Sequence, residues 1–306
     1  MSEEVSEQTR LEVFRIAKEQ GCFKKFYNAR YPKHVVAVLC PEFNGRYYSA
    51  INSVLKEYLW QKSCEVCIAA TDFSEEKEKE LLEYYHDYSN VDGIIVIGGT
   101  ITSQSQYEIP IVSMMPRGGK LGHLCLYSDL EQAMSQVVRH FVDAGVRQLG
   151  FLGELHTWKK QAAFCGELER RGLPEARVVV TKERFERGGY LGMEQLLAAG
   201  DCPRAVVCAY DHMAIGAMKC LADHGLSVPG DVAILGMDNI PEAEYLNVPL
   251  ASVDFRIHEI CAAATDAILA LLDDKEVAKE VVFQARFLNR YSACVAGKYH
   301  QTAFPF

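Results

Sequence analysis

Three polar side chains follow two neighbouring apolar runs of the chain, where they could bind a small molecule. Tyr210 and Asp211 come directly after the run 205–209. Asp238 comes shortly after the next run, 232–235. Both runs are too short for a helix and are typical of strands buried on both faces. Because ligands of open α/β sheets bind at the carboxyl ends of strands, these side chains are the first candidates for a binding site.

The two runs belong to a series of alternating strands and helices that starts at Val35. Between them, apolar residues recur at helical spacing, which predicts a strand–helix–strand unit. A second series of the same kind begins at Gln148. Two successive series of similar length indicate two similar domains, and right-handed crossovers make each sheet parallel. The predicted fold is therefore α/β, with two doubly wound parallel-sheet lobes.

The composition narrows the class of protein. With 306 residues the chain can form two domains, and its formal net charge of −9 argues against a broad nucleic-acid-binding surface on the folded core. The 11 cysteines are odd in number and scattered, which favours reduced thiols in the cytoplasm. Cys64 and Cys67 lie in or beside a predicted strand, so a spacing of three should put them on opposite faces. No apolar run reaches the length of about 18 residues that a membrane span needs.

The usual arrangements of catalytic residues are missing from the sequence. We find no Ser/His/Asp order and no metal-ligand spacing, and Gly98 with Gly99 is only a weak signal for a phosphate loop. The histidines are dispersed. We therefore expect a binding protein that is not an enzyme and has no metal ligands and no cofactor.

Several stretches are similar to signatures of the lactose-repressor (LacI/GalR) family of transcriptional regulators, whose core has the fold of periplasmic sugar-binding proteins. Residues 5–21 resemble the last helix of the family's DNA-binding headpiece. The stretches with the resemblance in the core are 91–95 (VDGII), 140–153 (HFVDAGVRQLGFLG), 211–216 (DHMAIG), 225–238 (GLSVPGDVAILGMD) and 249–253 (PLASV).

The resemblance implies a division of the chain into a headpiece remnant and two lobes joined by three crossovers. Residues 1–34 would be the remnant of the headpiece and hinge. The amino-terminal lobe would hold 35–153 with 255–278, and the carboxyl-terminal lobe 154–254 with 279–306, including a last strand at about 281–290. The ligand would lie in the cleft between the lobes, and closure would change the geometry of a homodimer.

The resemblance also assigns candidate ligand-binding residues. Asp238 matches an aspartate that accepts hydrogen bonds from ligand hydroxyls or ring nitrogens, although it could instead cap a loop. Phe185 lies where the family places an aromatic ring against the ligand, although it could be a core residue. Tyr47 and Tyr48 follow the first strand, where one ring could cover the ligand while the other packs inward.

Three further candidates have weaker support. Asn44 is the polar residue of the loop before the tyrosine pair, and Asp72 follows the second strand. Glu131 lies near the cleft end of its helix, but a capping box formed by Ser128 and Glu131 explains it nearly as well.

The sequence departs from the family's pattern at three positions, one of which is the aspartate usual just before Arg117, where this chain has Met115 in that region. The family often has an arginine that reaches the ligand where this chain has Ala163, and Lys160, about one turn earlier, could substitute without offering bidentate recognition. Tyr210 stands where asparagine is usual and is large enough to stack on a ligand. Asp211, next to it, is better explained as the N-cap of the following helix.

Together these features predict a cytoplasmic, ligand-responsive transcriptional regulator. Its effector would be a sugar or a related polyol or nucleoside. The protein would form a homodimer and would not contact a membrane. Operator DNA would be bound only through a headpiece that is incomplete in this chain, so we expect no tight operator binding by the chain itself. The alternative is a solute-binding protein of the periplasmic sugar-binding type that does not bind DNA.

Overall fold

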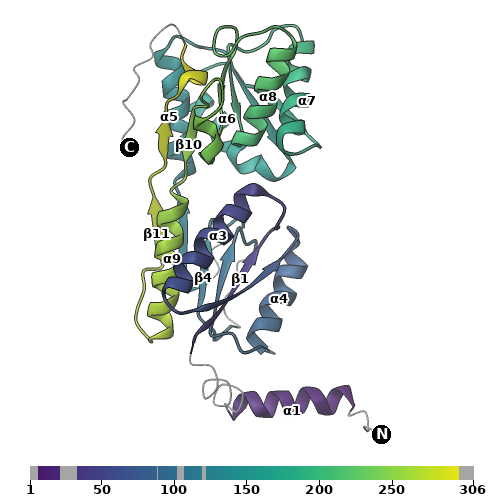
Figure 1. Ribbon diagram of the computed structural model, residues 1–306, viewed down its shortest axis with the longest axis vertical. Coiled ribbons are helices and arrows are strands. Elements are labelled where there is room, and N and C mark those ends of the chain that lie inside the picture. Colours follow the sequence, from purple (N-terminus) through teal and green to yellow (C-terminus); the bar gives the residue numbers. More distant parts are fainter. Residues whose placement is uncertain (1–5, 21–32, 88, 102–106, 119–121, 296–306) are drawn as a thin grey trace. The chain divides into compact units, whose positions relative to one another are not determined.

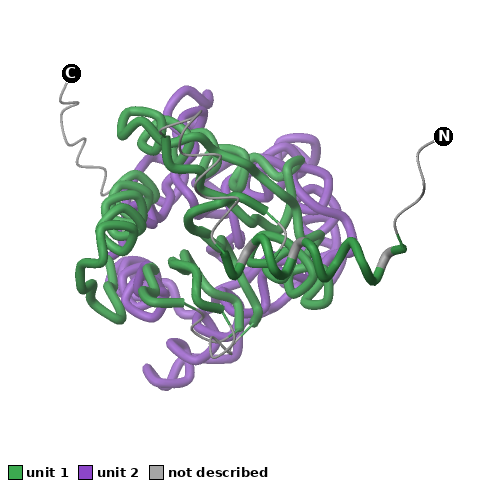
Figure 2. Tube along the Cα trace, turned by 90° about the horizontal axis from the view of Figure 1, so that it is seen from below, with its two compact units in different colours: residues 1–127, 257–283 green, residues 128–256, 284–306 purple. Residues whose placement is uncertain are grey.

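The computed structural model describes residues 6–20, 33–87, 89–101, 107–118 and 122–295. The chain forms two compact units (Figure 2). The first unit holds residues 1–127 and 257–283, and the second holds 128–256 and 284–306. Most of the predicted hinge lies outside the described residues. The predicted amino-terminal helix is present as α1 (Glu7–Glu19) (Figure 1).

The first unit is built on a six-stranded sheet with the order β11-β5-β4-β3-β1-β2. Its strands are β1 (Val35–Cys40), β2 (Glu65–Ala70), β3 (Gly93–Ile97), β4 (Ile111–Met114), β5 (Leu124–Ser128) and β11 (Glu280–Phe283). The pairs formed among β1 to β5 are all parallel. The helices of this unit's core are α3 (Arg46–Gln61), α4 (Glu75–Asp87) and α9 (Ile257–Leu272). Because β1 lies between β2 and β3, the chain changes its direction of winding at β1, as in a doubly wound fold.

The second unit repeats this plan with a smaller sheet of order β7-β6-β8-β9, in which every pair is parallel. Its strands are β6 (Leu149–Glu154), β7 (Arg177–Thr181), β8 (Ala205–Cys208) and β9 (Ala233–Leu235). Its α-helices are α5 (Leu130–Asp143), α6 (Trp158–Arg170), α7 (Phe185–Ala198) and α8 (Asp211–Asp223). Short 3₁₀ turns cover Leu155–Thr157, Pro241–Glu244 and Tyr291–Ala293. A separate antiparallel pair joins β10 (Ser252–Asp254) to β12 (Arg286–Leu288).

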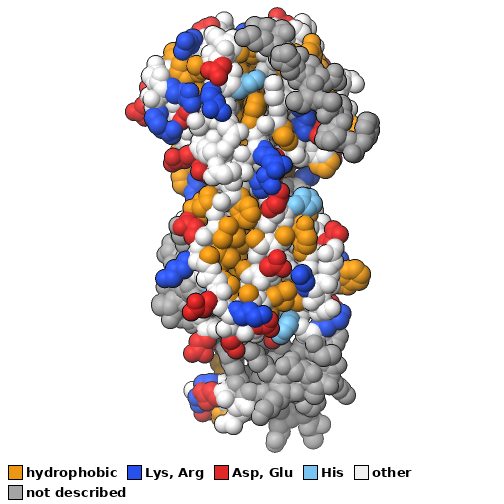
Figure 3. All heavy atoms as spheres, turned by 90° about the vertical axis from the view of Figure 1, so that its left-hand side faces the viewer, with side chains coloured by type: hydrophobic (Ala, Val, Ile, Leu, Met, Phe, Trp, Pro, Cys, Tyr) orange, Lys and Arg blue, Asp and Glu red, His pale blue; other side chains and the backbone are white. Residues whose placement is uncertain are grey.

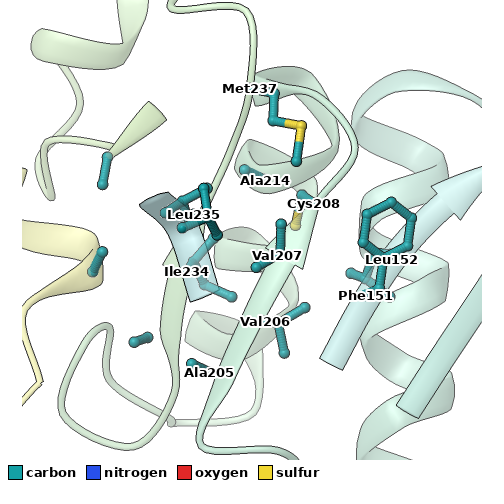
Figure 4. Packing of buried hydrophobic residues seen from close by; sticks show 14 of the residues in the cluster. Phe151, Leu152, Ala205, Val206, Val207, Cys208, Ala214, Ile234, Leu235 and Met237 are labelled. Carbon is teal, nitrogen blue, oxygen red and sulfur yellow. The ribbon is translucent and has the colours of Figure 1, made fainter. Parts of the chain in front are cut away.

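The core of the second unit follows from strands that are apolar on both faces. Figure 4 shows Val206 and Val207 of β8 beside Ile234 of β9, with Phe151 of β6 on the other side. These side chains are fully buried. Central parallel strands covered by helices on both faces require such continuous apolar runs, and this is why the sequence pattern was readable as strands.

The division between the units differs from the predicted one at the first crossing. The prediction kept 35–153 in one lobe, but the units divide between Tyr127 and Ser128. The reason is tertiary pairing, because β6 joins β7 and β8 in the second sheet and α5 packs against α6. The second division falls after Arg256, two residues from the predicted one.

The predicted last strand is also divided. Its first part, β11, joins the sheet of the first unit, whereas β12 pairs with β10 in the second unit. The third division therefore falls after Phe283 instead of after residue 278. The prediction for the cysteine pair is confirmed, because Cys64 is buried and Cys67 is exposed.

Candidate functional site

The carboxyl ends of β6, β8 and β9 bring two sequence candidates of the second unit together. Lys160 lies in the first turn of α6, which follows β6, and Asp238 follows β9. The Nζ of Lys160 donates hydrogen bonds to the Ala209 carbonyl at 2.8 Å and to Oδ1 of Asp238 at 2.9 Å. Because β6 and β8 are neighbours from which the sheet is wound in both directions, this is the edge where an open α/β sheet binds ligands.

The ion pair between Lys160 and Asp238 is largely shielded from solvent. The two side chains are 22% and 8% exposed. Lys160 also lies over the Phe255 ring, 5.1 Å from its centroid, so the ammonium contacts both a carboxylate and an aromatic face. A carboxylate has acceptor capacity on both oxygens, and Asp238 can therefore bind ligand hydroxyls while it keeps its bond to Lys160.

Two aromatic rings lie beside each other at the starts of α7 and α8. Phe185 begins α7, and its backbone N–H donates to the Tyr210 hydroxyl at 2.9 Å. The centroids of the two rings are 6.1 Å apart. The Arg184 guanidinium lies 4.7 Å from the Phe185 ring centroid. Burial raises the pKa of Tyr210, so this hydroxyl stays protonated at neutral pH.

Close packing of the two helices brings these rings together. A Cβ added at Gly189 of α7 would lie 1.9 Å from the Met213 carbonyl oxygen, and one added at Gly216 of α8 would lie 1.8 Å from that of Glu186. Only glycine permits such an approach of backbone to backbone. The two glycines therefore fix the distance between Phe185 and the start of α8.

Asp211 is not the helix cap that we predicted. Tyr210 occupies the N-cap position, and Asp211 is the first residue of α8. The oxygens of its fully buried carboxyl group accept hydrogen bonds from the Ile240 N–H at 2.8 Å and the Ser252 hydroxyl at 2.7 Å. Burial, with a further contribution from the Asp238 charge, raises the pKa of Asp211 to about 8. Asp211 thus ties the segment after β9 to β10.

A second aromatic group lies at the carboxyl edge of the first sheet. The Tyr47 and Tyr48 rings pack edge to face with centroids 5.3 Å apart, and Tyr48 packs against Phe73 at 6.0 Å. The Tyr47 hydroxyl donates to Sδ of Met115 at 3.0 Å. The guanidinium of Arg117 lies 4.8 Å from the Phe73 centroid. The tyrosine pair therefore belongs to a larger cluster after β1, β2 and β4.

The three weaker candidates lie in different settings. Asp72 follows β2 with a φ of +52° and forms an ion pair with Lys77. Asn44 is exposed in the loop before α3. Glu131 is 80% exposed and faces Arg170 in the last turn of α6. Lys160 is in the first turn of α6, so Glu131 lies at the opposite end of that helix from Lys160.

The predicted capping box of α5 is wrong. Asp129 is the N-cap, and its side chain accepts the Gln132 N–H at 2.9 Å. Ser128 instead donates to the Phe255 carbonyl. The sequence could not decide between two adjacent capping residues, because the competing partner of Ser128 is 127 residues away.

Two aromatic residues, one beside the candidates of each unit, were missed in the sequence. Phe255 follows β10 and Phe73 follows β2, so the rule that pointed to Asp238 also applied to them. β10 has only three residues and was not recognised as a strand. Asp72, beside Phe73, was considered because it lies at the end of the second strand.

The residues of the second unit form a candidate site for non-covalent binding. One half-buried cation, one carboxylate and a set of aromatic rings can orient a polar molecule that also has an apolar face. No group of three or more His, Cys, Asp or Glu side chains within the described ranges has an arrangement suited to a metal ion. The fold defines the class as a two-unit α/β core with parallel sheets, and these residues are its candidate site.

Comparison with known proteins identifies the family. Residues 138–293 match the model of the periplasmic binding protein-like domain, and the chain belongs to this family. The chain is 28% identical over 230 residues to the HTH-type transcriptional repressor MelR of Bacillus subtilis (strain 168). The match covers 69% of this chain and 66% of MelR. The resemblance to LacI/GalR regulators in the effector-binding core is thereby confirmed.

Solved structures support the same fold. The transcription regulator GntR from Chromobacterium violaceum superposes with a TM-score of 0.76 at 23% identity, covering 85% of this chain and 99% of GntR. A periplasmic binding protein/LacI transcriptional regulator from Alkaliphilus metalliredigens QYMF, complexed with D-xylulofuranose, superposes with a TM-score of 0.73 at 19% identity. The match covers 86% of this chain and 100% of that chain. At these identities the likeness shows the fold alone.

Proposed function

We propose that this protein is a ligand-responsive transcriptional regulator of the LacI/GalR type whose effector binds at the carboxyl edge of the second sheet. The observation that carries the proposal is the shielded pair of Lys160 and Asp238 at the switch point of that sheet. A charged pair at this edge is costly to bury unless it gains hydrogen bonds, and ligand hydroxyls supply them.

The chemistry of the site favours a sugar or a related polyol as the effector. Asp238 accepts hydrogen bonds from hydroxyl groups, while Phe185 and Tyr210 offer ring faces to the apolar face of a sugar. Lys160 already neutralises Asp238, so a neutral ligand is a better match than a cation. The similar Alkaliphilus regulator is complexed with D-xylulofuranose, which makes pentuloses sensible first probes.

The regulator is favoured over the solute-binding alternative. MelR, which matches more than two thirds of this chain, is a transcriptional repressor by name. No helix among the described residues is long and apolar enough to cross a membrane, and this finding fits both readings. Removing the gene should raise the transcripts of a defined gene set, and the effector should raise the same set in unmodified cells. Unchanged transcripts together with a ligand-binding chain outside the cytoplasmic membrane would support the alternative.

The proposed regulator acts as a homodimer. Apolar side chains gather on the side of the first unit where α9 and β11 lie (Figure 3). Among the residues there, Leu269, Leu271 and Val281 are only partly buried. Burial of such a face in a second copy would be favourable. Sedimentation velocity at micromolar concentration should give a dimer, and a monomer across that range would contradict this part of the proposal.

A thermal-shift screen tests the effector. D-xylulose, other sugars, sugar phosphates and nucleosides should be compared, because a ligand that binds only the folded state raises the melting temperature. Asp238→Ala should lower the affinity of the best hit by about 10- to 100-fold, the usual effect of losing a charged hydrogen-bond partner. Asp201→Ala is the matched control, since this carboxylate is 66% exposed and pairs with Arg177. Equal affinity in wild type and Asp238→Ala would refute the site.

A further inference from the structure

The backbone around Asp238 adopts an uncommon conformation. Asp238 has a φ of +95° and Asn239 a φ of +49°. Both values lie in the left-handed region that residues with a Cβ avoid. Two such residues in succession stay in place only when surrounding groups hold them there. What holds this turn therefore decides where the Asp238 carboxylate points.

Three successive backbone N–H groups of the turn are each held by a separate acceptor. The N–H of Asp238 donates to the Val253 carbonyl at 2.9 Å. The N–H of Asn239 donates to the Ser252 hydroxyl at 3.0 Å. The N–H of Ile240 donates to the Asp211 carboxylate at 2.8 Å. Two of these acceptors are on β10, so the position of the turn depends on that strand.

Arg290 holds the turn through a side chain. Its Nη2 donates to Oδ1 of Asn239 at 2.8 Å and to Oε1 of Glu244 at 2.7 Å. Its Nη1 donates to the Leu250 carbonyl at 2.8 Å. The arginine side chain is only 12% exposed. The planar guanidinium thus connects Asn239 to Glu244 and Leu250 of the segment between the turn and β10, which the single charge of a lysine cannot reproduce.

Arg290 comes from a distant part of the chain. It follows β12, which pairs with β10 through Ser252 and Val253, the residues that also hold the turn. The segment that carries Arg290 belongs to the part of the second unit contributed by residues 284–306. The turn is therefore fixed on one side by β10 and on the other by the residue that follows the strand paired with it.

We propose that Arg290 is a positioning residue for ligand binding, which acts through Asn239 to hold the turn that presents Asp238. The structural part of this inference concerns the ligand-free turn. Only its consequence for affinity rests on the proposed function. The two parts can therefore fail separately.

Hydrogen–deuterium exchange of the ligand-free chain tests the structural part. Arg290→Gln should raise the exchange of the amides in a peptide that spans 237–241 by at least about ten-fold, the usual effect of losing a hydrogen bond to a charged group. Peptides from β6 should not change. Arg290→Lys should give an intermediate rise. Arg286→Gln is the matched control, because Arg286 is an exposed residue of β12 and its loss should leave the turn unchanged.

A suppressor variant separates positioning from general stability. Glycine adopts a φ of +49° without strain. Asn239→Gly should therefore restore protection of the turn in the Arg290→Gln background, although it removes the acceptor that Arg290 uses in the wild type. A merely structural arginine would not be rescued by a change at residue 239.

Two results would overturn the inference. One is unchanged exchange of the turn in Arg290→Gln, and the other is a uniform rise over the whole second unit that Asn239→Gly does not reverse. D-xylulose, if it shifts the melting temperature of the wild type, is the probe for the second part. Its affinity should fall at least about ten-fold in Arg290→Gln and recover in the double variant. The amides of the turn could be protected from exchange in the wild type while no sugar raises the melting temperature. That result would keep the role of Arg290 in holding the turn and would reject the proposed function.

Discussion

Gly216 offers the sharpest test of how the site is assembled. A Cβ at this position would lie 1.8 Å from the carbonyl oxygen of Glu186 and 2.8 Å from the backbone nitrogen of Tyr190. Both atoms belong to the backbone of α7, which cannot rotate aside as a side chain can. In Gly216→Ala the two helices must separate by about 1.2 Å at this point, since a Cβ contact needs at least 3.0 Å.

We expect Gly216→Ala to lower the free energy of unfolding by about 2 kcal/mol. Overpacking costs about 1–3 kcal/mol and more where backbone must move, while alanine returns at most about 1 kcal/mol through its helix propensity. Separation of α7 from α8 also moves Phe185 away from Tyr210, which lie at the starts of these helices. The variant should therefore weaken effector binding as well.

Gly166→Ala is the control, and it should have the opposite sign. Gly166 lies inside α6, where an added Cβ meets no atom within 4 Å. The same substitution should stabilise the protein there by about 0.5–1 kcal/mol. Urea unfolding followed by circular dichroism measures both variants. A Gly216→Ala protein as stable as the wild type, or a Gly166→Ala protein equally destabilised, would refute the reasoning.

Three further predictions concern charged groups of the second unit. The pKa of Asp211 is raised to about 8 in the folded state, so between about pH 4 and pH 8 the unfolded chain has lost a proton that the folded chain keeps. The free energy of unfolding should therefore fall as the pH rises through this window, by up to about 1.4 kcal/mol per pH unit. Asp211→Asn should remove that part of the slope when the free energy of unfolding is measured from pH 5 to pH 7. Equal slopes in the wild type and the variant would contradict the burial of this group. Asp129→Ala should lower the free energy of unfolding by about 1 kcal/mol through loss of the N-cap hydrogen bond, whereas Glu131→Ala should change it by less than about 0.5 kcal/mol. A larger loss in Glu131→Ala than in Asp129→Ala would instead support the predicted capping box of Ser128 and Glu131. Lys160→Met should weaken binding of the best effector at least about ten-fold in calorimetry, because it leaves the shielded Asp238 carboxylate without its cation; unchanged affinity would mean that the effector does not use this pair.

The strand ends of the site were readable from the sequence because their signals are local. Short apolar runs predicted β8 and β9, and the polar residues after them became the candidates Tyr210 and Asp238. Lys160 became a candidate only through the resemblance, as a substitute for the family's arginine, and it lies in the first turn of α6. That Lys160 and Asp238 contact each other was not predicted and is found only in the structure.

The role of Asp211 was not readable in this way. An aspartate before a helix predicts an N-cap, and the prediction failed because a partner 29 residues away, the Ile240 N–H, binds the carboxylate instead. A local rule gives only the preference of a residue in the absence of tertiary partners. Where a buried amide needs an acceptor, the tertiary contact prevails.

The sequence by itself determined the α/β class, the two series of strands and helices and the edge of the sheet where a ligand would bind. These depend on periodicities and strand lengths that neighbouring residues carry. Only the tertiary structure decided which unit β6 joins, how β11 and β12 are separated, and which residue holds the turn at Asp238. Arg290 and Asn239 are 51 residues apart, and no local pattern encodes their bond. Such contacts form only when folding brings distant segments to one place, and this is why they could be found in the structure alone.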